Sequence, residues 1–158
     1  MSAFHGTGGL NDTQAMLVDV ATSARSFLLP HWYRWHRAWG PPFPSAPSRW
    51  TCVRSSLFLL NVLRQCGVTA TIQSGQARET SPGSVGEDCG LLTPIGWAGH
   101  AWVEADRFVV DITADQFGQP PVVITSSDDP AYRPARDPAN RLAPTASGIA
   151  AVAEIWPL

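Results

Sequence analysis

The chain has 158 residues and a formal net charge of −2, and 44% of its residues are hydrophobic, among them seven tryptophans. This composition excludes a disordered chain, and the length fits a single domain that spans residues 1–158. A charge so close to zero points by itself neither to a nucleic acid nor to an acidic substrate.

The charges are unevenly distributed along the chain. Through Arg78 the sequence has seven arginines against Asp12 and Asp19, whereas from Glu79 onward it has four arginines against eleven acidic residues. Such an asymmetry either lines a cleft with opposite charges or belongs to a solvated surface with no specific role. Both interpretations stay open at this point.

The three cysteines have no regular spacing, which favours reduced thiols in a cytoplasm over a disulfide scaffold. The N-terminal sequence lacks the basic and apolar segments of a signal peptide. No apolar run approaches the roughly 20 residues that cross a bilayer. We therefore expect a cytoplasmic protein with no membrane partner.

The first element expected in chain order is a helix. Asn11–Thr13 are suited to cap it, apolar residues follow at helical spacing, and Pro30 is expected to end it.

The next segment, His31–Trp39, alternates aromatic with basic residues. Such a pattern allows stacking on single-stranded nucleic acid. The basic residues are few, however, so we favour an amphipathic segment that packs over the core with its Arg and His side chains in solvent. We expect no nucleic-acid partner.

A central helix is predicted after a stiff connector, Gly40–Ser48, that contains four prolines. Apolar residues from Val53 onward cover most of the helix circumference, which is typical of a buried helix. Thr51 is the expected N-cap, Gly67 is the expected C-cap, and Cys52 falls in the first turn.

This position of Cys52 has chemical consequences. The free N–H groups and the positive dipole end of a helix favour a thiolate over a thiol, and the same N–H groups can stabilise an oxyanion. The alternative is a structural cysteine. We expect Cys66 to fill the core and Cys89 to be an exposed thiol in a polar loop.

Beyond the central helix, Val68–Gln73 alternates like a strand, and Ser74–Ala98 is expected to be a long loop of the kind that closes over a cleft. Residues 122–125 are predicted to form a short edge strand, and residues 126–148 to wrap the surface. Residues 149–158 are expected to form a last strand or a tail.

The segment Gly99–Thr113 is dominated by Val, Trp and Phe and is interrupted once, at Ala105-Asp106. This predicts two strands joined by a tight hairpin. A turn centred at that point places His100 directly opposite Asp111, on the same face of the sheet. A shift of one residue would place the two on opposite faces.

The order of these elements resembles the transglutaminase-like branch of the papain-type thiol enzymes. In that family a His-Ala-Trp-Val-Glu motif, a short turn and then Asp-x-Thr carry the histidine and the aspartate. This chain has His100–Glu104 and Asp111–Thr113 in that order, with Cys52 ahead of both. The resemblance covers about residues 48 to 118.

The resemblance implies an α+β fold in which a central helix that carries Cys52 packs on an antiparallel sheet that carries His100 and Asp111. It implies Cys52 as the nucleophile, His100 as general base and then acid, and Asp111 as the carboxylate that orients the imidazole. Attack of a thiolate on an amide carbon requires these three roles on chemical grounds as well. Asp115 is the alternative to Asp111, and the hairpin register favours Asp111.

The sequence also departs from the pattern of the family that it resembles. Papain-like proteases commonly have a glutamine several residues ahead of the cysteine as an oxyanion donor, and this chain has no glutamine at that distance. Some transglutaminase-like members use an indole N–H instead, so Trp50 is a candidate donor, with a core or cleft-wall tryptophan as the alternative. Tandem acidic residues that would bind calcium are absent, and we expect no metal and no cofactor.

The compact bacterial members that this chain resembles include leader-peptide peptidases of ribosomal peptide maturation and protein deamidases. We therefore expect a thiol-dependent acyl-transfer enzyme, either a cysteine peptidase or a glutamine deamidase or transglutaminase, with a peptide or protein substrate. The alternative is a non-catalytic peptide-binding domain on the same fold. A nucleic-acid module centred on His31–Trp39 is the third hypothesis.

Overall fold

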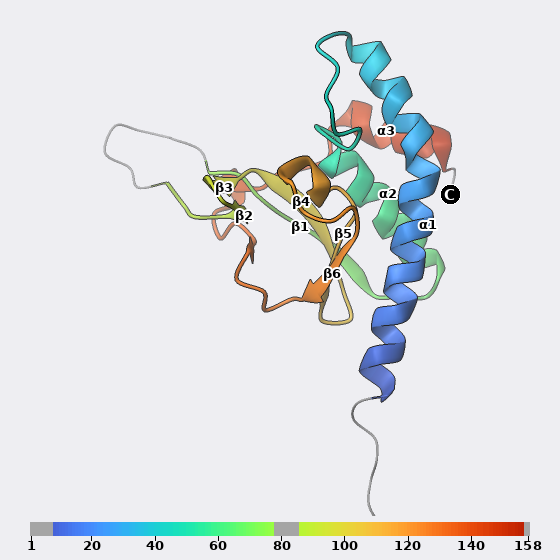
Figure 1. The fold of residues 1–158 in the computed structure, drawn as a ribbon, viewed down its shortest axis with the longest axis vertical. Coiled ribbons are helices and arrows are strands. Elements are labelled where there is room, and N and C mark those ends of the chain that lie inside the picture. The colour runs from blue at the N-terminus through green and yellow to red at the C-terminus, as the bar shows by residue number, and fades with distance from the viewer. Residues whose placement is uncertain (1–7, 78–85, 157–158) are drawn as a thin grey trace, which may run out of the picture.

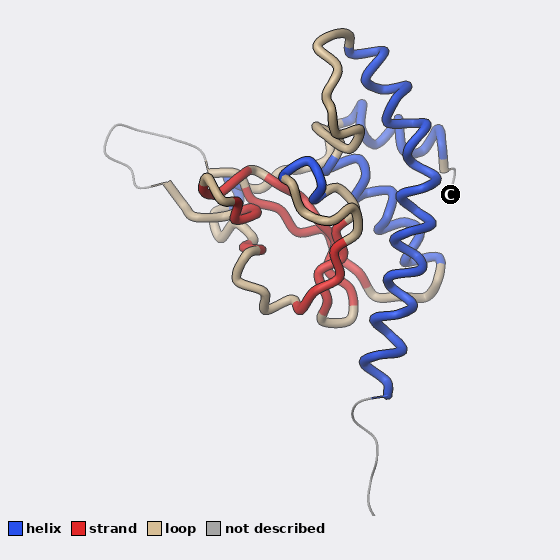
Figure 2. Tube along the Cα trace, viewed as in Figure 1, coloured by secondary structure: helices blue, strands red, loops and turns tan. Residues whose placement is uncertain are grey.

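The computed structural model describes residues 8–77 and 86–156. In this part of the chain the α-helices lie to one side of two antiparallel sheets (Figure 1, Figure 2). The helices are α1 (Gly8–Trp39), α2 (Cys52–Gln65) and α3 (Ala146–Ile155), with two short 3-10 helices, η1 (Ala114–Phe117) and η2 (Pro138–Asn140). The predicted α+β class is confirmed at this level.

The larger sheet has four strands in the order β1 (Ala70–Gly75), β4 (His100–Ala105), β5 (Phe108–Asp111) and β6 (Val123–Ser126). The smaller sheet has three, in the order β3 (Gly96–Ala98), β2 (Gly90–Thr93) and β7 (Tyr132–Arg133). Strand β4 is central and buried on both faces. One face, with Val103, packs against α1 and α2, and the other, with Trp102, packs against the smaller sheet.

Helix α1 does not end at Pro30 as predicted but continues to Trp39. A proline inside a helix removes a hydrogen bond and costs about 3 kcal/mol. Here the apolar inner face continues beyond the proline. Leu28 lies before it, Trp32 and Trp35 follow at spacings of four and three residues, and all three are buried. Burial of the two indoles offsets the cost of the proline. Despite its length, neither α1 nor another helix in the described ranges is apolar enough to cross a membrane.

The aromatic and basic segment His31–Trp39 forms the last turns of α1. Trp32, Trp35 and His36 are buried, while the arginines of the segment are exposed. The packed amphipathic segment is therefore confirmed, except that His36 is not in solvent. Its Nε2 lies 2.8 Å from the carbonyl oxygen of Pro47, so the ring attaches α1 to the connector.

Helix α2 begins at Cys52, as predicted, after a connector that contains neither helix nor strand. Thr51 occupies the N-cap position, but its hydroxyl donates to the carbonyl oxygen of Ser48 at 2.6 Å and does not cap the helix. The N–H groups of the first turn are therefore left for another acceptor.

The two remaining cysteines differ from expectation. Cys66 does not fill the core but is the exposed C-cap residue of α2, because the helix ends at Gln65 and Gly67, with a φ of 78°, turns the chain away. Cys89 is not an exposed thiol but is buried just ahead of β2. Burial and the nearby acidic side chains raise the pKa of its thiol.

The stretch Ser74–Ala98 is not one long loop as expected. Strand β1 covers residues 70–75 rather than 68–73, and β2 and β3 form a hairpin between residues 90 and 98. The predicted lid is reduced to the residues between β1 and β2, of which 78–85 lie outside the described part of the chain.

The β4–β5 hairpin is confirmed, but its register differs by two residues from the predicted one. Ala105 pairs with Phe108, so the turn consists of Asp106 and Arg107, with φ angles of 48° and 69°. Two positive φ angles are typical of the tight turn whose twist matches that of the strands it joins. Because side chains alternate with a period of two, the shift leaves every residue on its predicted face.

The C-terminal region combines a confirmed strand with a wrong prediction. Strand β6 forms the edge of the larger sheet, as expected. Residues 146–155, however, form helix α3 rather than a strand or tail. The Thr145 hydroxyl accepts a hydrogen bond from the Gly148 N–H at 3.0 Å, and the alanines that follow are strong helix formers.

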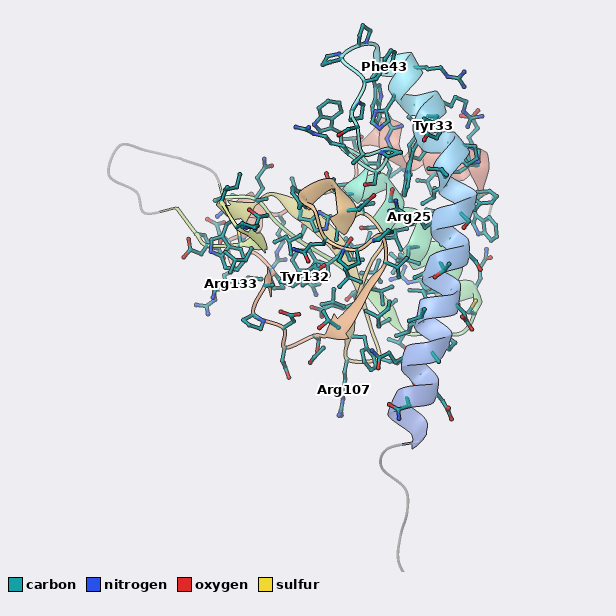
Figure 3. The ribbon with its side chains drawn as sticks, viewed as in Figure 1. Arg25, Tyr33, Phe43, Arg107, Tyr132 and Arg133 are labelled. Carbon is teal, nitrogen blue, oxygen red and sulfur yellow. The ribbon has the colours of Figure 1, made fainter. Side chains whose placement is uncertain are left out.

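Arg25 connects α1 to the segment that follows β5 (Figure 3). Its guanidinium donates to both carboxylate oxygens of Asp115, at 3.0 and 2.7 Å, and to the carbonyl oxygen of Ile112 at 2.7 Å. The two charged side chains are 17% and 18% exposed, so solvent screens this ion pair only in part.

Replacement of Arg25 by alanine leaves the Asp115 carboxylate without its cation. We expect Arg25→Ala to lower the free energy of unfolding by about 2–3 kcal/mol, measured by urea denaturation at pH 7. The control is Arg37→Ala, at an exposed position on the same helix, which should change it little. Equal losses in the two variants would contradict this role of Arg25.

Candidate active site

The candidate nucleophile lies at the N-terminus of α2. Cys52 is the first residue of the helix and is partly exposed. The helix enters the core directly behind it, with Phe58, Leu59 and Leu63 buried. The buried part of α2 therefore holds the first turn in place, while Cys52 itself stays partly exposed.

The predicted contact between His100 and Asp111 is confirmed. His100 Nε2 lies 2.7 Å from Asp111 Oδ2, and both side chains are fully buried. His100 begins β4 and Asp111 ends β5. Because the observed register is shifted by two residues from the predicted one, the two residues lie diagonally across the strand pair rather than directly opposite each other. They share a face of the sheet in either register.

Asp111 accepts further hydrogen bonds that sequence analysis did not identify. The Tyr132 hydroxyl, from the smaller sheet (Figure 3), donates to Oδ2 at 2.8 Å, and the Thr113 N–H donates to Oδ1 at 2.9 Å. The Thr113 in the Asp-x-Thr motif could have indicated the second bond. Nothing in the sequence indicated Tyr132, because it lies in a segment that was expected only to wrap the surface.

These contacts determine the protonation of the pair. Burial lowers the pKa of His100, but the Asp111 carboxylate, and to a smaller extent Cys52, outweigh this effect and raise the pKa to about 10. Burial acts to raise the pKa of Asp111, but the charge of His100 and the hydrogen bonds from His100, Thr113 and Tyr132 lower it overall. At neutral pH the pair is therefore an imidazolium and a carboxylate.

The imidazole is enclosed by two aromatic side chains. Trp102 stacks on His100 with ring centroids 6.1 Å apart, and Phe117, from η1, meets it edge-on at 5.1 Å. With Nε2 bonded to Asp111, the remaining ring nitrogen is Nδ1, which is buried and has no hydrogen-bond partner among the described residues. Cys52 is near enough to stabilise the protonated ring. The hydrogen bond between Nε2 and Asp111 fixes the ring, so Nδ1 is the nitrogen that remains for the Cys52 sulfur.

The sequence indicated two further candidates for the site, Asp115 as the orienting carboxylate and Trp50 as an oxyanion donor. Asp115 does not contact His100 but pairs with Arg25 and accepts a hydrogen bond from the Ser48 hydroxyl at 2.5 Å. Trp50 is 54% exposed, and its indole contacts Arg49 and His36. Its φ of 66° is uncommon for a residue with a side chain, so the chain is strained just before α2. An oxyanion role for Trp50 stays a prediction.

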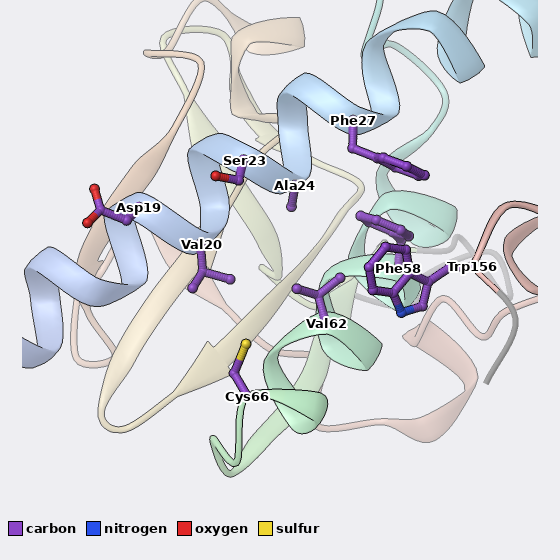
Figure 4. Close-up of a pocket in the computed structure, with 9 residues that line it drawn as sticks. All are labelled: Asp19, Val20, Ser23, Ala24, Phe27, Phe58, Val62, Cys66 and Trp156. Carbon is purple, nitrogen blue, oxygen red and sulfur yellow. The ribbon is translucent and has the colours of Figure 1, made fainter.

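An apolar hollow of about 430 Å³ lies between α1 and α2, away from this site (Figure 4). Phe27, Phe58 and Trp156 line one end of it, and Cys66 lines the other. Among the described residues that line it are a thiol, Cys66, and a carboxylate, Asp19, but no histidine, so the hollow lacks the imidazole that a thiol enzyme needs.

No metal centre emerges from the part of the chain that the structure describes. Nowhere in residues 8–77 and 86–156 do three His, Cys, Asp or Glu side chains come close enough together to hold an ion.

Comparisons of the chain with protein-family models, with curated proteins and with solved structures find no match. A functional proposal therefore rests on the sequence motif and on the geometry around Cys52, His100 and Asp111.

The His100–Asp111 pair makes stability depend on pH. The pKa of His100 rises from 6.5 to about 10 on folding, so its contribution is complete below pH 6.5 and is lost as the pH rises toward 10. The pKa of Asp111 falls below 3.8, so its contribution is present above that pH and is lost as the pH falls further.

We therefore expect Asp111→Asn to lower the free energy of unfolding by about 3–5 kcal/mol, because it leaves a buried imidazole without its anion. The difference from the wild type should be greatest between pH 3.8 and 6.5 and small near pH 10, measured by urea denaturation across this range. The control is Asp128→Asn, at an exposed position. A difference that does not change with pH would contradict the assignment.

Proposed function

We propose that this protein is a thiol-dependent acyl-transfer enzyme of transglutaminase-like fold, with Cys52 as nucleophile, His100 as acid and base, and Asp111 as the orienting carboxylate. One observation carries the proposal: a buried imidazole, bonded through Nε2 to a carboxylate, lies near a cysteine at a helix N-terminus, and its Nδ1 has no hydrogen-bond partner among the described residues. Its substrate is the amide of a peptide or protein, and the proposed compartment is the cytoplasm.

The reaction begins with attack of the Cys52 thiolate on the amide carbon. An imidazolium and a helix N-terminus beside a cysteine both favour the thiolate form. The carbonyl oxygen takes up the electron pair of its π bond, and the N–H groups of the first turn of α2 can stabilise the resulting oxyanion. Trp50 is the proposed second donor.

His100 then acts as the acid. The carbon–nitrogen bond breaks, the departing amine takes the proton from Nδ1, and a thioester to Cys52 remains. A water molecule next gives a proton to Nδ1 and attacks the thioester, which releases the acid and restores the thiolate and the imidazolium. Peptide hydrolysis and deamidation differ in the first leaving group, and transamidation replaces the water by an amine.

The arrangement of elements supports the transglutaminase-like fold. Helix α2 packs on β4, and β5 follows β4 through a tight turn, so the three residues come from adjacent elements. This is the order that the sequence motif led us to expect. The chemistry also requires these three residues to be close together, since nucleophile, base and orienting group must meet within hydrogen-bond reach.

The complete burial of His100, which is 0% exposed, favours a second candidate function. In a peptide-binding domain without catalysis, the imidazole and Asp111 would only stabilise the sheet. Such a domain would bind its peptide equally well with or without the Cys52 sulfur, so the two candidates predict different results for Cys52→Ala.

Helix α2 offers a matched pair of thiols for a test of nucleophile activation. Cys66, at its C-terminal end, is more exposed than Cys52, at its N-terminal end. Accessibility alone therefore predicts faster alkylation of Cys66. If Cys52 is activated, iodoacetamide should modify it about tenfold faster, and His100→Gln should remove the advantage. Peptide mapping by mass spectrometry measures both rates, and faster reaction of Cys66 would refute the activated thiol.

The reaction itself is tested by mass spectrometry of peptides incubated with the wild type and with Cys52→Ala. Cleavage indicates a peptidase, a gain of about one dalton indicates deamidation, and an adduct with an added amine indicates transamidation. Each product should be lost in Cys52→Ala and retained in Cys66→Ala. Peptides that bind the wild type and Cys52→Ala equally and stay intact with both would establish the binding domain instead.

A further inference from the structure

Two arginines flank the candidate nucleophile. Arg49 precedes Cys52 by three residues, and Arg54 follows it by two. Arg49 lies over the Trp50 ring at 4.9 Å, and Arg54 lies over both Trp35 and Trp39 at 5.1 Å. Stacking on an indole holds a guanidinium in place but leaves the N–H donors at its edge free for a planar anion.

Neither arginine has an acidic partner in the described part of the chain. The ion pairs found there are Arg25 with Asp115 and His100 with Asp111. Asp111 and Asp115 are thus already neutralised and cannot balance Arg49 or Arg54. Burial of Arg54 lowers its pKa, which indicates a cation with part of its hydration removed. Such a cation gains from the arrival of an anion.

Arg54 lines a hollow of about 270 Å³ on one side of Cys52. Trp50, Val53 and Leu57 form one wall of this hollow, and residues from Leu142 to Gly148 form the other. The second wall lies close to the site, because the Leu142 N–H donates to the hydroxyl of Ser74 at 2.9 Å, and the next residue of β1 pairs with His100. The remaining lining is mostly apolar, and among the described residues that form it Arg54 is the only one with a charged side chain.

Arg49 lines a second hollow, of about 470 Å³, which shares no lining residue with the first. The β2–β3 hairpin forms one wall, and Gln116 and Phe117 form the other. Phe117 joins this hollow to the site, since its ring also contacts His100. Here too, within the part of the lining that the structure describes, Arg49 is the single charged side chain among apolar and uncharged groups.

We propose that the Cys52 site selects an acidic peptide, in which carboxylate side chains on either side of the reacting amide bind Arg49 and Arg54 in these two hollows. The role of the amide rests on the proposed function, whereas the recognition of carboxylates does not. A guanidinium edge matches a carboxylate with two parallel hydrogen bonds, and the apolar walls accommodate the rest of each side chain. Two of the seven arginines in the first half of the chain, Arg49 and Arg54, would thus face the substrate.

The test compares two alkylating reagents at Cys52. Iodoacetate and iodoacetamide react alike, since sulfur displaces iodide from a CH₂ group, but only iodoacetate carries a carboxylate. The measured quantity is the ratio of the iodoacetate rate to the iodoacetamide rate at each thiol. Because the His100 cation also attracts iodoacetate, the decisive comparison is between variants that differ only at the arginines.

We expect the ratio at Cys52 to fall about fivefold when Arg49→Gln and Arg54→Gln are combined, as expected for the loss of cations near the reacting group. The ratio at Cys66 in the same molecules should not change. Arg37→Gln, at an exposed position of α1, is the control for net charge. Arg54→Lys keeps the charge and should keep most of the ratio, which separates loss of charge from loss of packing against the tryptophans.

An unchanged ratio at Cys52 in the double variant, or an equal fall in Arg37→Gln, would overturn the proposal. The two proposals can fail separately. A slow iodoacetamide reaction at Cys52 would contradict the activated nucleophile but not the preference for anions. A fast reaction whose rate ratio does not change in the arginine variants would contradict the preference for anions but not the activated nucleophile.

Peptides complete the test as competitors that protect Cys52 from iodoacetamide. A glutamine-containing peptide with aspartate on both sides should protect at lower concentration than its asparagine counterpart, and the difference should disappear in the double variant. Equal protection by the two peptides, or better protection by a single-stranded oligonucleotide, would show that these arginines do not recognise peptide carboxylates.

Discussion

The structure around the candidate site depends on one buried ion pair, between the imidazole of His100 and the carboxylate of Asp111. Removal of both charges from water costs several kcal/mol for each, and their mutual attraction compensates only when the remaining polar atoms also find partners. Tyr132 and the Thr113 N–H supply those partners for Asp111. The smaller sheet, which contributes Tyr132, is therefore part of the site and not an accessory to it.

A second set of contacts determines where Cys52 lies relative to this pair. The Trp32 indole donates to the Ser55 hydroxyl at 2.9 Å, this hydroxyl donates to Thr51 at 3.0 Å, and Thr51 donates to the carbonyl of Ser48. The Ser48 hydroxyl in turn reaches Asp115, which Arg25 holds. The proline-rich connector is thus fastened to α1 and to η1 just before α2 begins. The unusual backbone at Trp50 persists because the residues on either side of it are held.

Local patterns in the sequence predicted the parts of this site that depend on local physics. The prolines of the connector and the apolar run after it indicated that a helix would begin at Cys52. The His100–Asp111 contact was predicted although the register was wrong by two residues, because side-chain alternation preserves the face. Contacts between distant segments had no local signal. Tyr132 lies in the two-residue strand β7, within a segment that was expected only to wrap the surface, and the continuation of α1 through Pro30 depends on burial that only the assembled core provides.

The charges of the proposed catalytic pair and the charges of the proposed recognition residues lie in different surroundings. His100 and Asp111 are buried, so salt in the solvent screens their interaction little, and the state of the imidazole depends on its protein neighbours. Arg49 and Arg54 stand on tryptophan faces at the rims of two hollows, where salt screens them and a ligand can compete with water. If the arginines recognise an acidic peptide as proposed, changes in them would alter which peptide is bound without disturbing the imidazole. The proposed recognition could then vary through the residues that flank Cys52 while the sheet that carries His100 and Asp111 stays unchanged.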